Sequence, residues 1–332
     1  MGQGLLRHPA LGAPRKRGTA AAMSHWKRQT YRGPARARKA APLRLPRDTT
    51  VQHGFCAIMR SGIDQLTTNH TAGLNGRNIE CVHQMRVALR RLSATLALFR
   101  DVISSPSAAR ITDDLRWLGS ILGRARDWDV FATQTVEKVN KAPRALVAAE
   151  SSAEAASALR LAAHREAAQA LGSARYYALI RAMDTWLAGK QWCESLDPAI
   201  RPLLEAPLAE AGRPWLDRSA RKARKAGKGI KHLTGKQRHR LRITIKQLRY
   251  DTQSLSSLYA DKKVRPYVDA LRDLQDVLGD LNDLAVARKL MGIVKGRDFA
   301  AMNDRLGAAI AERLKALAPA WRHFRKISPF WE

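Results

Sequence analysis

Two basic amphipathic segments, 156 residues apart, limit what this chain can fold into. They are Val82–Leu92 and Arg238–Tyr250. On a 3.6-residue period each has one apolar stripe and, beside it, one stripe of His, Arg and Lys. Such a helix buries its apolar stripe against other helices and leaves its cations at the edge. Leu-, Ala- and Arg-rich runs with helical spacing dominate the rest of the chain, and the alternating patterns of β-strands are scarce. The sequence therefore predicts an all-α fold.

The two segments match residue by residue. His83 pairs with His239, Arg86 with Arg242, and Arg90 with Lys246. A second match at the same offset pairs Leu122–Val130 with Leu278–Val286, and so places Asp127 opposite Asp283. Two matches at one offset, with no insertion between them, indicate an internal duplication. We therefore expect two antiparallel four-helix bundles related by a pseudo-twofold axis.

The second segment lies in an interval without acids. No Asp or Glu occurs between Asp217 and Asp251, although solvated basic helices usually carry acids one turn away. The chain of 332 residues has a net charge of +30, and its pI is about 11.0. This charge predicts a polyanionic partner, which is a nucleic acid, an anionic membrane surface or a phosphate polymer.

The chain divides into a tail and a helical body. Residues 1–49 are basic, rich in Gly, Pro and Ala, and without acid until Asp48, so we expect this segment to be disordered. Residues 50–325 form the predicted domain, with halves of about 50–195 and 206–325 joined by a Pro-rich stretch. Helices are expected over 50–70, 79–103, 107–124, 127–140, 144–170, 173–188, 214–230, 235–259, 263–279, 281–293 and 297–317, followed by a short tail.

The remaining composition points to the cytoplasm. The three cysteines, Cys56, Cys81 and Cys193, are scattered and predicted to be reduced. No apolar run approaches the roughly 20 residues that span a bilayer. Neither a metal nor another cofactor is expected, because no set of His, Cys and carboxylates has ligand spacing.

The candidate site is the pair of cationic stripes. If the two halves bring their stripes to one surface, guanidinium, ammonium and imidazole groups line a groove or pore. Arginine binds phosphate oxygens bidentately, and lysine adds a point charge. The plainer interpretation is a solvated basic edge with structural histidines. Asp127 and Asp283 either orient an arginine of the basic helix or cap a helix that starts there.

At these residues the chain resembles the CHAD family, an α-helical domain named for its histidines. The matching segments are Val82–Leu92, Leu122–Asp127, Leu241–Tyr250 and Leu274–Asp283, within a resemblance that covers about residues 50–325. It implies two pseudo-twofold-related bundles with a basic central pore or surface, binding of inorganic polyphosphate, and location at polyphosphate granules. The binding positions of the family map onto His83, Arg86, Arg90, His239, Arg242, Lys246 and Arg249, and Lys222 and Lys225 look like further members.

This sequence departs from the family pattern in two places. Ser93 stands where the repeat would have a basic residue, which shortens the stripe of the first half. CHAD domains are also often joined to an N-terminal CYTH-type triphosphatase with a Glu-x-Glu-x-Lys motif, and that motif is absent here. Residues 36–50 resemble the linker that follows such a domain, so the chain is expected to be a shortened relative.

Three function classes follow from these patterns. The leading one is a non-catalytic module that binds polyphosphate. The second is a nucleoid-associated protein that binds nucleic acid non-specifically, although the basic stripe has no interleaved aromatic residues for base stacking. The third is an enzyme of phosphate transfer, which needs carboxylates grouped around Mg²⁺. The close acid pairs lie among arginines, so we expect no catalysis. The sequence does not indicate an oligomeric state.

Overall fold

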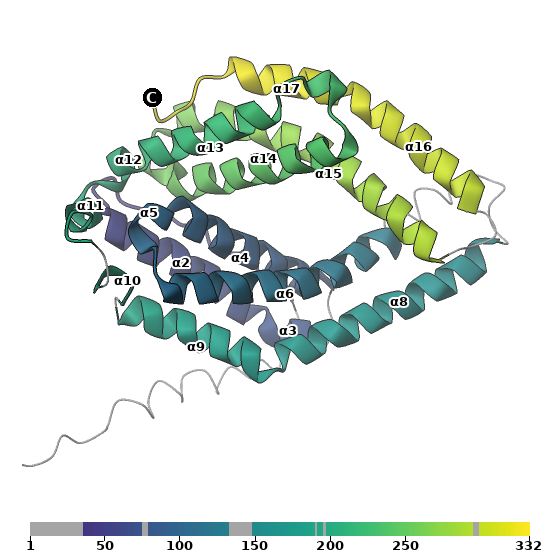
Figure 1. Ribbon diagram of the computed structural model, residues 1–332, viewed down its shortest axis with the longest axis horizontal. Coiled ribbons are helices and arrows are strands. Elements are labelled where there is room, and N and C mark those ends of the chain that lie inside the picture. Colours follow the sequence, from purple (N-terminus) through teal and green to yellow (C-terminus); the bar gives the residue numbers. More distant parts are fainter. Residues whose placement is uncertain (1–35, 75–78, 133–147, 190, 195–196, 295–298) are drawn as a thin grey trace, which may run out of the picture. The chain divides into compact units, whose positions relative to one another are not determined.

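All regular secondary structure in the part of the chain described here is helical. The computed structural model describes residues 36–332 apart from 75–78, 133–147, 190, 195–196 and 295–298. Besides the helices these residues contain one isolated β-bridge, between Thr50 and Pro207 (Figure 1). The predicted all-α fold class is confirmed. Residues Ala35–Glu332 form one compact unit, and the description below is of that unit alone.

The first half is organised around its basic helix, α4. The helices of this half are α2 (Val51–Thr68), α3 (His70–Leu74), α4 (Ile79–Leu98), α5 (Arg100–Ile103), α6 (Pro106–Val130), α8 (Ala148–Leu171) and α9 (Ala174–Ala188). Helix α4 packs against both α2 and α6. Its residues Met85, Leu89 and Leu92 are buried, as the predicted apolar stripe requires. This packing leaves the adjacent stripe of α4 free to carry cations.

The second half has the same plan around α14. The short helix α10 (Gln191–Glu194) ends the first half, and α11 (Arg201–Glu205) lies in the connecting stretch. The elements of the second half are α12 (Leu208–Ala211), α13 (Arg213–Ala226), η2 (Ile230–His232), α14 (Gly235–Leu255), η3 (Ser256–Leu258), α15 (Asp261–Val294), α16 (Phe299–Lys315) and α17 (Leu317–Lys326). Helix α14 packs against α13 and α15. Thr234 and Gln237 form a capping box, which fixes where α14 begins.

Corresponding elements occur at the repeat offset. Helices α4 and α14 begin at Ile79 and Gly235, which are 156 residues apart. Each lies in the middle of a three-helix set, α2–α4–α6 in one case and α13–α14–α15 in the other. The duplication and the pseudo-twofold relation nevertheless stay predictions.

Two predicted helix breaks are wrong. Helices expected over 107–124 and 127–140 are a single helix, α6, as far as Val130, and the helices expected over 263–279 and 281–293 are the single helix α15. Gly123 and Gly279, close to the predicted breaks, are helical, and a Cβ on either would meet nothing within 4 Å. The apolar stripe continues across both glycines, so burial holds each helix together. Residues 133–140 lie outside the described part of the chain.

The ends of the chain also differ from expectation. Residues 36–49 belong to the segment predicted to be disordered, yet they follow an extended path against the helices. Leu45 is buried and its N–H donates to Ser257 Oγ, while Arg38 N–H donates to Asn69 Oδ1. Residues 1–35 lie outside the described part. At the other end, the predicted short tail contains the helix α17.

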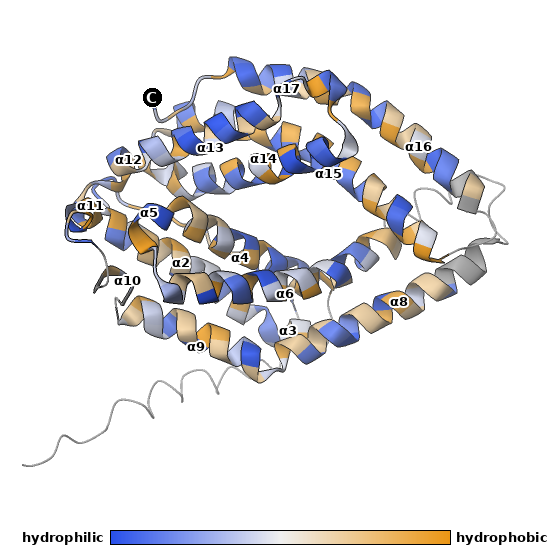
Figure 2. Ribbon diagram, viewed as in Figure 1, coloured by the Kyte–Doolittle hydropathy of each residue, from blue (hydrophilic) through white to orange (hydrophobic). Residues whose placement is uncertain are grey.

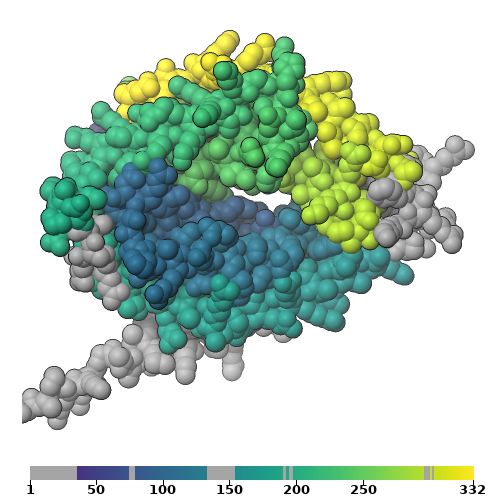
Figure 3. Space-filling view, viewed as in Figure 1, coloured from purple at the N-terminus to yellow at the C-terminus, as the bar shows by residue number. Residues whose placement is uncertain are grey.

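The two halves meet on both sides of an opening. On one side α4 contacts α14, where Gln247 Nε2 donates to the Ala94 carbonyl at 3.2 Å. On the other side α15 contacts α6 and α8. Between these contacts the space-filling view shows a gap that passes through the unit, with α4 and α6 below it and α14 and α15 above (Figure 3). The two basic helices therefore border one opening.

Candidate functional site

Four cations from the two basic helices form one group, the cationic cluster: Arg86 and Arg90 of α4 with Arg242 and Lys246 of α14. All four are half-buried. The pKa of Lys246 is lowered to about 7, first by burial and then by the charges of Arg242, Arg90 and Arg86. Charges exert this influence only at short range in a partly dry site. The stripes of the two halves thus meet at one place.

The two arginines of α4 are held by specific contacts. Arg86 Nη1 donates to the Gly123 carbonyl at 3.1 Å and lies 3.5 Å from Asp127 Oδ1, both on α6. Arg90 Nε donates to the hydroxyl oxygen of Tyr250 at 3.1 Å. The second contact joins the two halves directly. Both guanidinium groups are therefore fixed in position before any ligand arrives.

Arg242 is the least satisfied member of the cluster. Its Nε is buried without a hydrogen-bond partner among the described residues, and so is Nε of Arg249 one turn beyond the cluster. Within the same part of the chain Arg242 makes no ion pair, although the charge of Asp283 acts on it. Buried donors are nearly always paired in native proteins. An unpaired, half-buried guanidinium is consistent with a site that takes its acceptor from a ligand.

The two carboxylates of the second repeat lie at the cluster. Burial raises the pKa of Asp127, and the charge of Asp283 raises it further, whereas Arg86 and Arg242 lower it. Asp127 contacts Arg86, as the predicted orienting role requires. The alternative that these residues cap helices is wrong, because α6 and α15 run through both positions. The cluster thus combines four cations with two carboxylates, so its net charge is positive.

The two predicted histidines have different surroundings. His83 is half-buried, and burial together with the charges of Arg126, Arg90 and Arg86 lowers its pKa. Its imidazole is therefore neutral at pH 7 and belongs to the edge of the cluster. His239 is exposed, and its Nδ1 lies 3.2 Å from Asn282 Oδ1 on α15. The histidines at paired positions thus do not share one environment.

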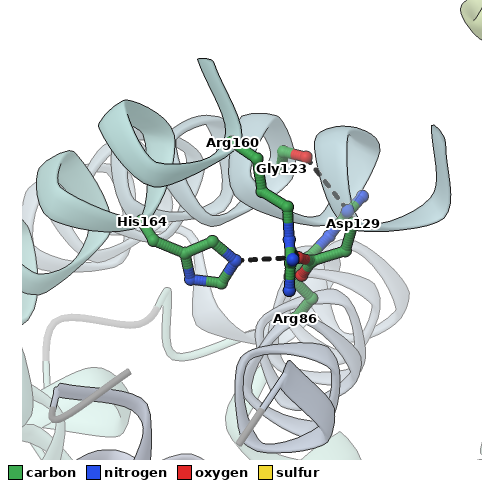
Figure 4. A network of polar contacts seen from close by, with 5 residues as sticks. All are labelled: Arg86, Gly123, Asp129, Arg160 and His164. Atoms are coloured by element: carbon green, nitrogen blue, oxygen red, sulfur yellow. Dashed lines mark hydrogen bonds and ion pairs between the residues drawn. The ribbon is translucent and has the colours of Figure 1, made fainter. Parts of the chain in front are cut away.

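A buried ionic network fixes the end of α6 next to the cluster (Figure 4). Asp129 is fully buried and accepts hydrogen bonds from Arg160 Nε and His164 Nε2 of α8, each at 2.8 Å. Figure 4 shows Arg86 and its bond to the Gly123 carbonyl beside this network. Asp129 lies two residues after Asp127 on the same helix. The network therefore anchors the segment of α6 that positions Arg86.

The structure does not bring Lys222 or Lys225 into the cluster. Lys222 lines a small pocket between α4, α13 and α14 that also contains Gln247 and the buried Asp251. These residues lie on the side of α14 away from Arg242, because α13 packs there. The pKa of Asp251 is raised to about 7, mainly by burial. Lys225 is exposed on α13, and no described contact links it to the motif helices.

Two residues of the site were not predicted. Tyr250 was expected to be core or interface, and it is buried, but its hydroxyl also holds Arg90. Arg126 acts electrostatically on His83 and Arg86. The signal for Arg126 was present, since it stands directly before Asp127 in the second repeated segment.

Two kinds of functional element are absent from the described residues. Within the described residues, no helix is both long and apolar enough to cross a membrane. Over the same residues, no three His, Cys, Asp or Glu side chains come together as metal ligands would. The cationic cluster is a half-buried group of hydrogen-bond donors and positive charges.

Comparison with known proteins identifies this architecture. The profile of the CHAD domain matches residues 57–292, which is most of the chain, so the chain belongs to the CHAD domain family. A crystal structure of the CHAD domain from the plant Ricinus communis is similar, with a TM-score of 0.74 and 29% sequence identity. The match covers 86% of this chain and 96% of that one.

More distant relatives agree on the fold. PptA from Streptomyces chartreusis has a TM-score of 0.60 at 18% identity, covering 84% of this chain and 99% of that one, which shows the fold alone. Two uncharacterized proteins of Mycobacterium tuberculosis, from strains CDC 1551 / Oshkosh and H37Rv, are each 25% identical over 221 residues. Each match covers 63% of this chain and 39% of the length of the relative.

Proposed function

We propose that the protein binds inorganic polyphosphate without cleaving it, and that the cationic cluster is the binding site. The proposal includes cytoplasmic location at polyphosphate granules, as the resemblance to the family implies. The observation that carries it is the unpaired, half-buried Arg242 among three other cations and two carboxylates. A site with this charge balance favours an anion with several closely spaced phosphates.

Nucleic acid is the alternative ligand. Backbone phosphates of DNA would also be attracted by a charge of +30. The aromatic residue at the cluster, Tyr250, is buried and bonded to Arg90, so it offers no free ring face for a base. A bare phosphate polymer therefore suits the cluster better than a nucleic acid does.

Competition between the two polyanions tests the proposal. Labelled long-chain polyphosphate is bound to the protein on filters and challenged with unlabelled polyphosphate or duplex DNA at equal phosphate concentration. We expect polyphosphate to displace the label and DNA to displace it only in large excess, with binding weakening steeply as salt rises. Displacement by DNA at equal phosphate would overturn the proposal in favour of nucleic acid.

Binding is expected to depend on pH through Lys246. Its pKa is about 7 in the free protein, and a bound polyanion raises it, so binding takes up a proton. Lys246 contributes its full share of the binding affinity below pH 7, where it is already protonated in the free protein. This share is lost as the pH rises from 7 toward the higher pKa that Lys246 has in the complex. Because binding takes up one proton at this group, the affinity for polyphosphate should fall by about tenfold between pH 6 and pH 8.

Titration calorimetry at several pH values measures this dependence. The Lys246→Arg variant is the matched control, because arginine stays protonated throughout the range. We expect its affinity to be nearly constant from pH 6 to pH 8. An equally steep loss in this variant would assign the proton to another group.

A further inference from the structure

A second, separate group of cations lies on the outer side of the second half. We call it the outer basic face, and it consists of Arg221, Arg224, Lys228, Lys231, Arg322 and Arg325. All six are exposed, and none makes an ion pair with another described residue. Figure 2 shows hydrophilic residues over much of α13, where this face begins.

The turn after α13 and the short helix η2 pack against α17, and the C-terminal segment packs against α13. Gly227, at the end of α13, has no room for a side chain, because a Cβ there would lie 2.2 Å from the ring of Trp321 on α17. Trp331 Nε1 donates to Asp217 Oδ1 at 2.8 Å, so the end of the chain also lies against α13. Arg221 and Arg224 follow Asp217 by one and two helical turns and share its side of α13. Lys228 and Lys231, on the turn and on η2, therefore lie beside α17, and the cations of α13 lie on the side of that helix that the C-terminal segment contacts.

The outer basic face is distinct from the cationic cluster. Arg242 and Lys246 lie near Arg90 of α4, whereas α13 packs on another side of α14. A ligand that reaches both groups must pass around a helical layer, and one helix with its side chains is about 10 Å thick. A short chain of phosphates cannot do this, but a long flexible chain can.

We propose that the outer basic face is a second contact surface for the same polyphosphate molecule, so that long chains bind both groups and short chains bind only the cationic cluster. This inference rests on the proposed function. The second contact is intramolecular once the first has formed, so its gain in affinity depends on chain length. The large aromatic residues beside this face, Trp321 and Trp331, are buried, so nothing there would stack on a base.

The test compares polyphosphate chain lengths in three variants of the 332-residue chain. The first, Arg221→Gln/Arg322→Gln/Arg325→Gln, removes three exposed charges from the outer basic face. The matched control, Arg110→Gln/Arg165→Gln/Arg181→Gln, removes three exposed, unpaired charges from the first half. The third, Arg242→Gln/Lys246→Gln, removes charges from the cluster. Each is titrated with tripolyphosphate as the short chain, with polyphosphate of several hundred phosphates as the long chain, and with duplex DNA.

The inference predicts that the outer variant loses about tenfold in affinity for long chains and less than twofold for short ones. The control variant should change both by less than threefold. Equal losses in the outer and control variants would mean that net charge alone acts, and would overturn the inference. So would an outer variant that loses DNA binding but keeps long-chain affinity.

The cluster variant separates this inference from the proposed function. If it keeps its affinity for short chains, the proposed function fails whatever the outer variant does. If the cluster variant loses its affinity for short chains while the outer variant binds long chains normally, the proposed function is supported. The same result would show that the outer basic face is not a second contact surface.

Discussion

The Arg242→Gln/Lys246→Gln variant is expected to lose at least about 100-fold in affinity for polyphosphate, because each charge-assisted hydrogen bond contributes roughly 1.5–3 kcal/mol. Neither side chain makes an ion pair with another described residue, so the substitutions break no ion pair there, although Asp127 and Asp283 lose nearby positive charge. Their mutual repulsion disappears as well. We therefore expect the helical circular dichroism and the thermal midpoint to be maintained.

The measurement is a binding titration beside circular dichroism on the same samples. The control is Arg110→Gln/Arg181→Gln, which removes the same charge from exposed positions of the first half. Affinity in the control should fall by less than threefold. Full retention of binding in the cluster variant would show that polyphosphate binds elsewhere on this basic protein.

The second large effect concerns stability. Asp129→Ala is expected to lower the free energy of unfolding by about 3–5 kcal/mol, because it leaves Arg160 without its buried carboxylate partner. The change also frees the end of α6 from α8, where both hydrogen bonds to Asp129 originate. Since this segment carries Asp127 and the Gly123 carbonyl, the position of Arg86 should be disturbed too.

Chemical denaturation measures the loss, and Asp113→Ala is the matched control. Asp113 is exposed and, among the described residues, pairs with Arg116 one turn along the same helix, so its removal should cost about 0.5 kcal/mol or less. A small effect at Asp129, similar to that at Asp113, would mean that the buried network does not hold α6.

Local patterns predicted the basic helices well. The apolar stripe of Met85, Leu89 and Leu92 is buried, and the cations beside it reach the surface between the halves. Helical periodicity decides which residues share a face, and burial of the apolar face then decides where the cations lie. For the same reason the residues of the cluster could be chosen from the sequence.

Contacts between distant segments could not be predicted in this way. Arg90 and Tyr250 are 160 residues apart, and their bond depends on which faces of α4 and α14 meet. Periodicity also does not say on which side of α14 the preceding helix packs, so Lys222 was wrongly grouped with Arg242. The helix ends predicted at 124 and 279 were wrong, because the buried apolar residues of α6 and α15 continue past both positions and hold the next turn in place.

The opening between the halves is bounded by protein on every side in Figure 3, and contacts of α4 with α14 and of α15 with α6 close it at its two ends. A linear polymer inside such a ring can slide along its own length, but it can leave only when one of its termini passes through. Release would then slow as the polymer lengthens, even where the affinity per phosphate is unchanged. Retention of long chains would be a property of ring topology as much as of charge.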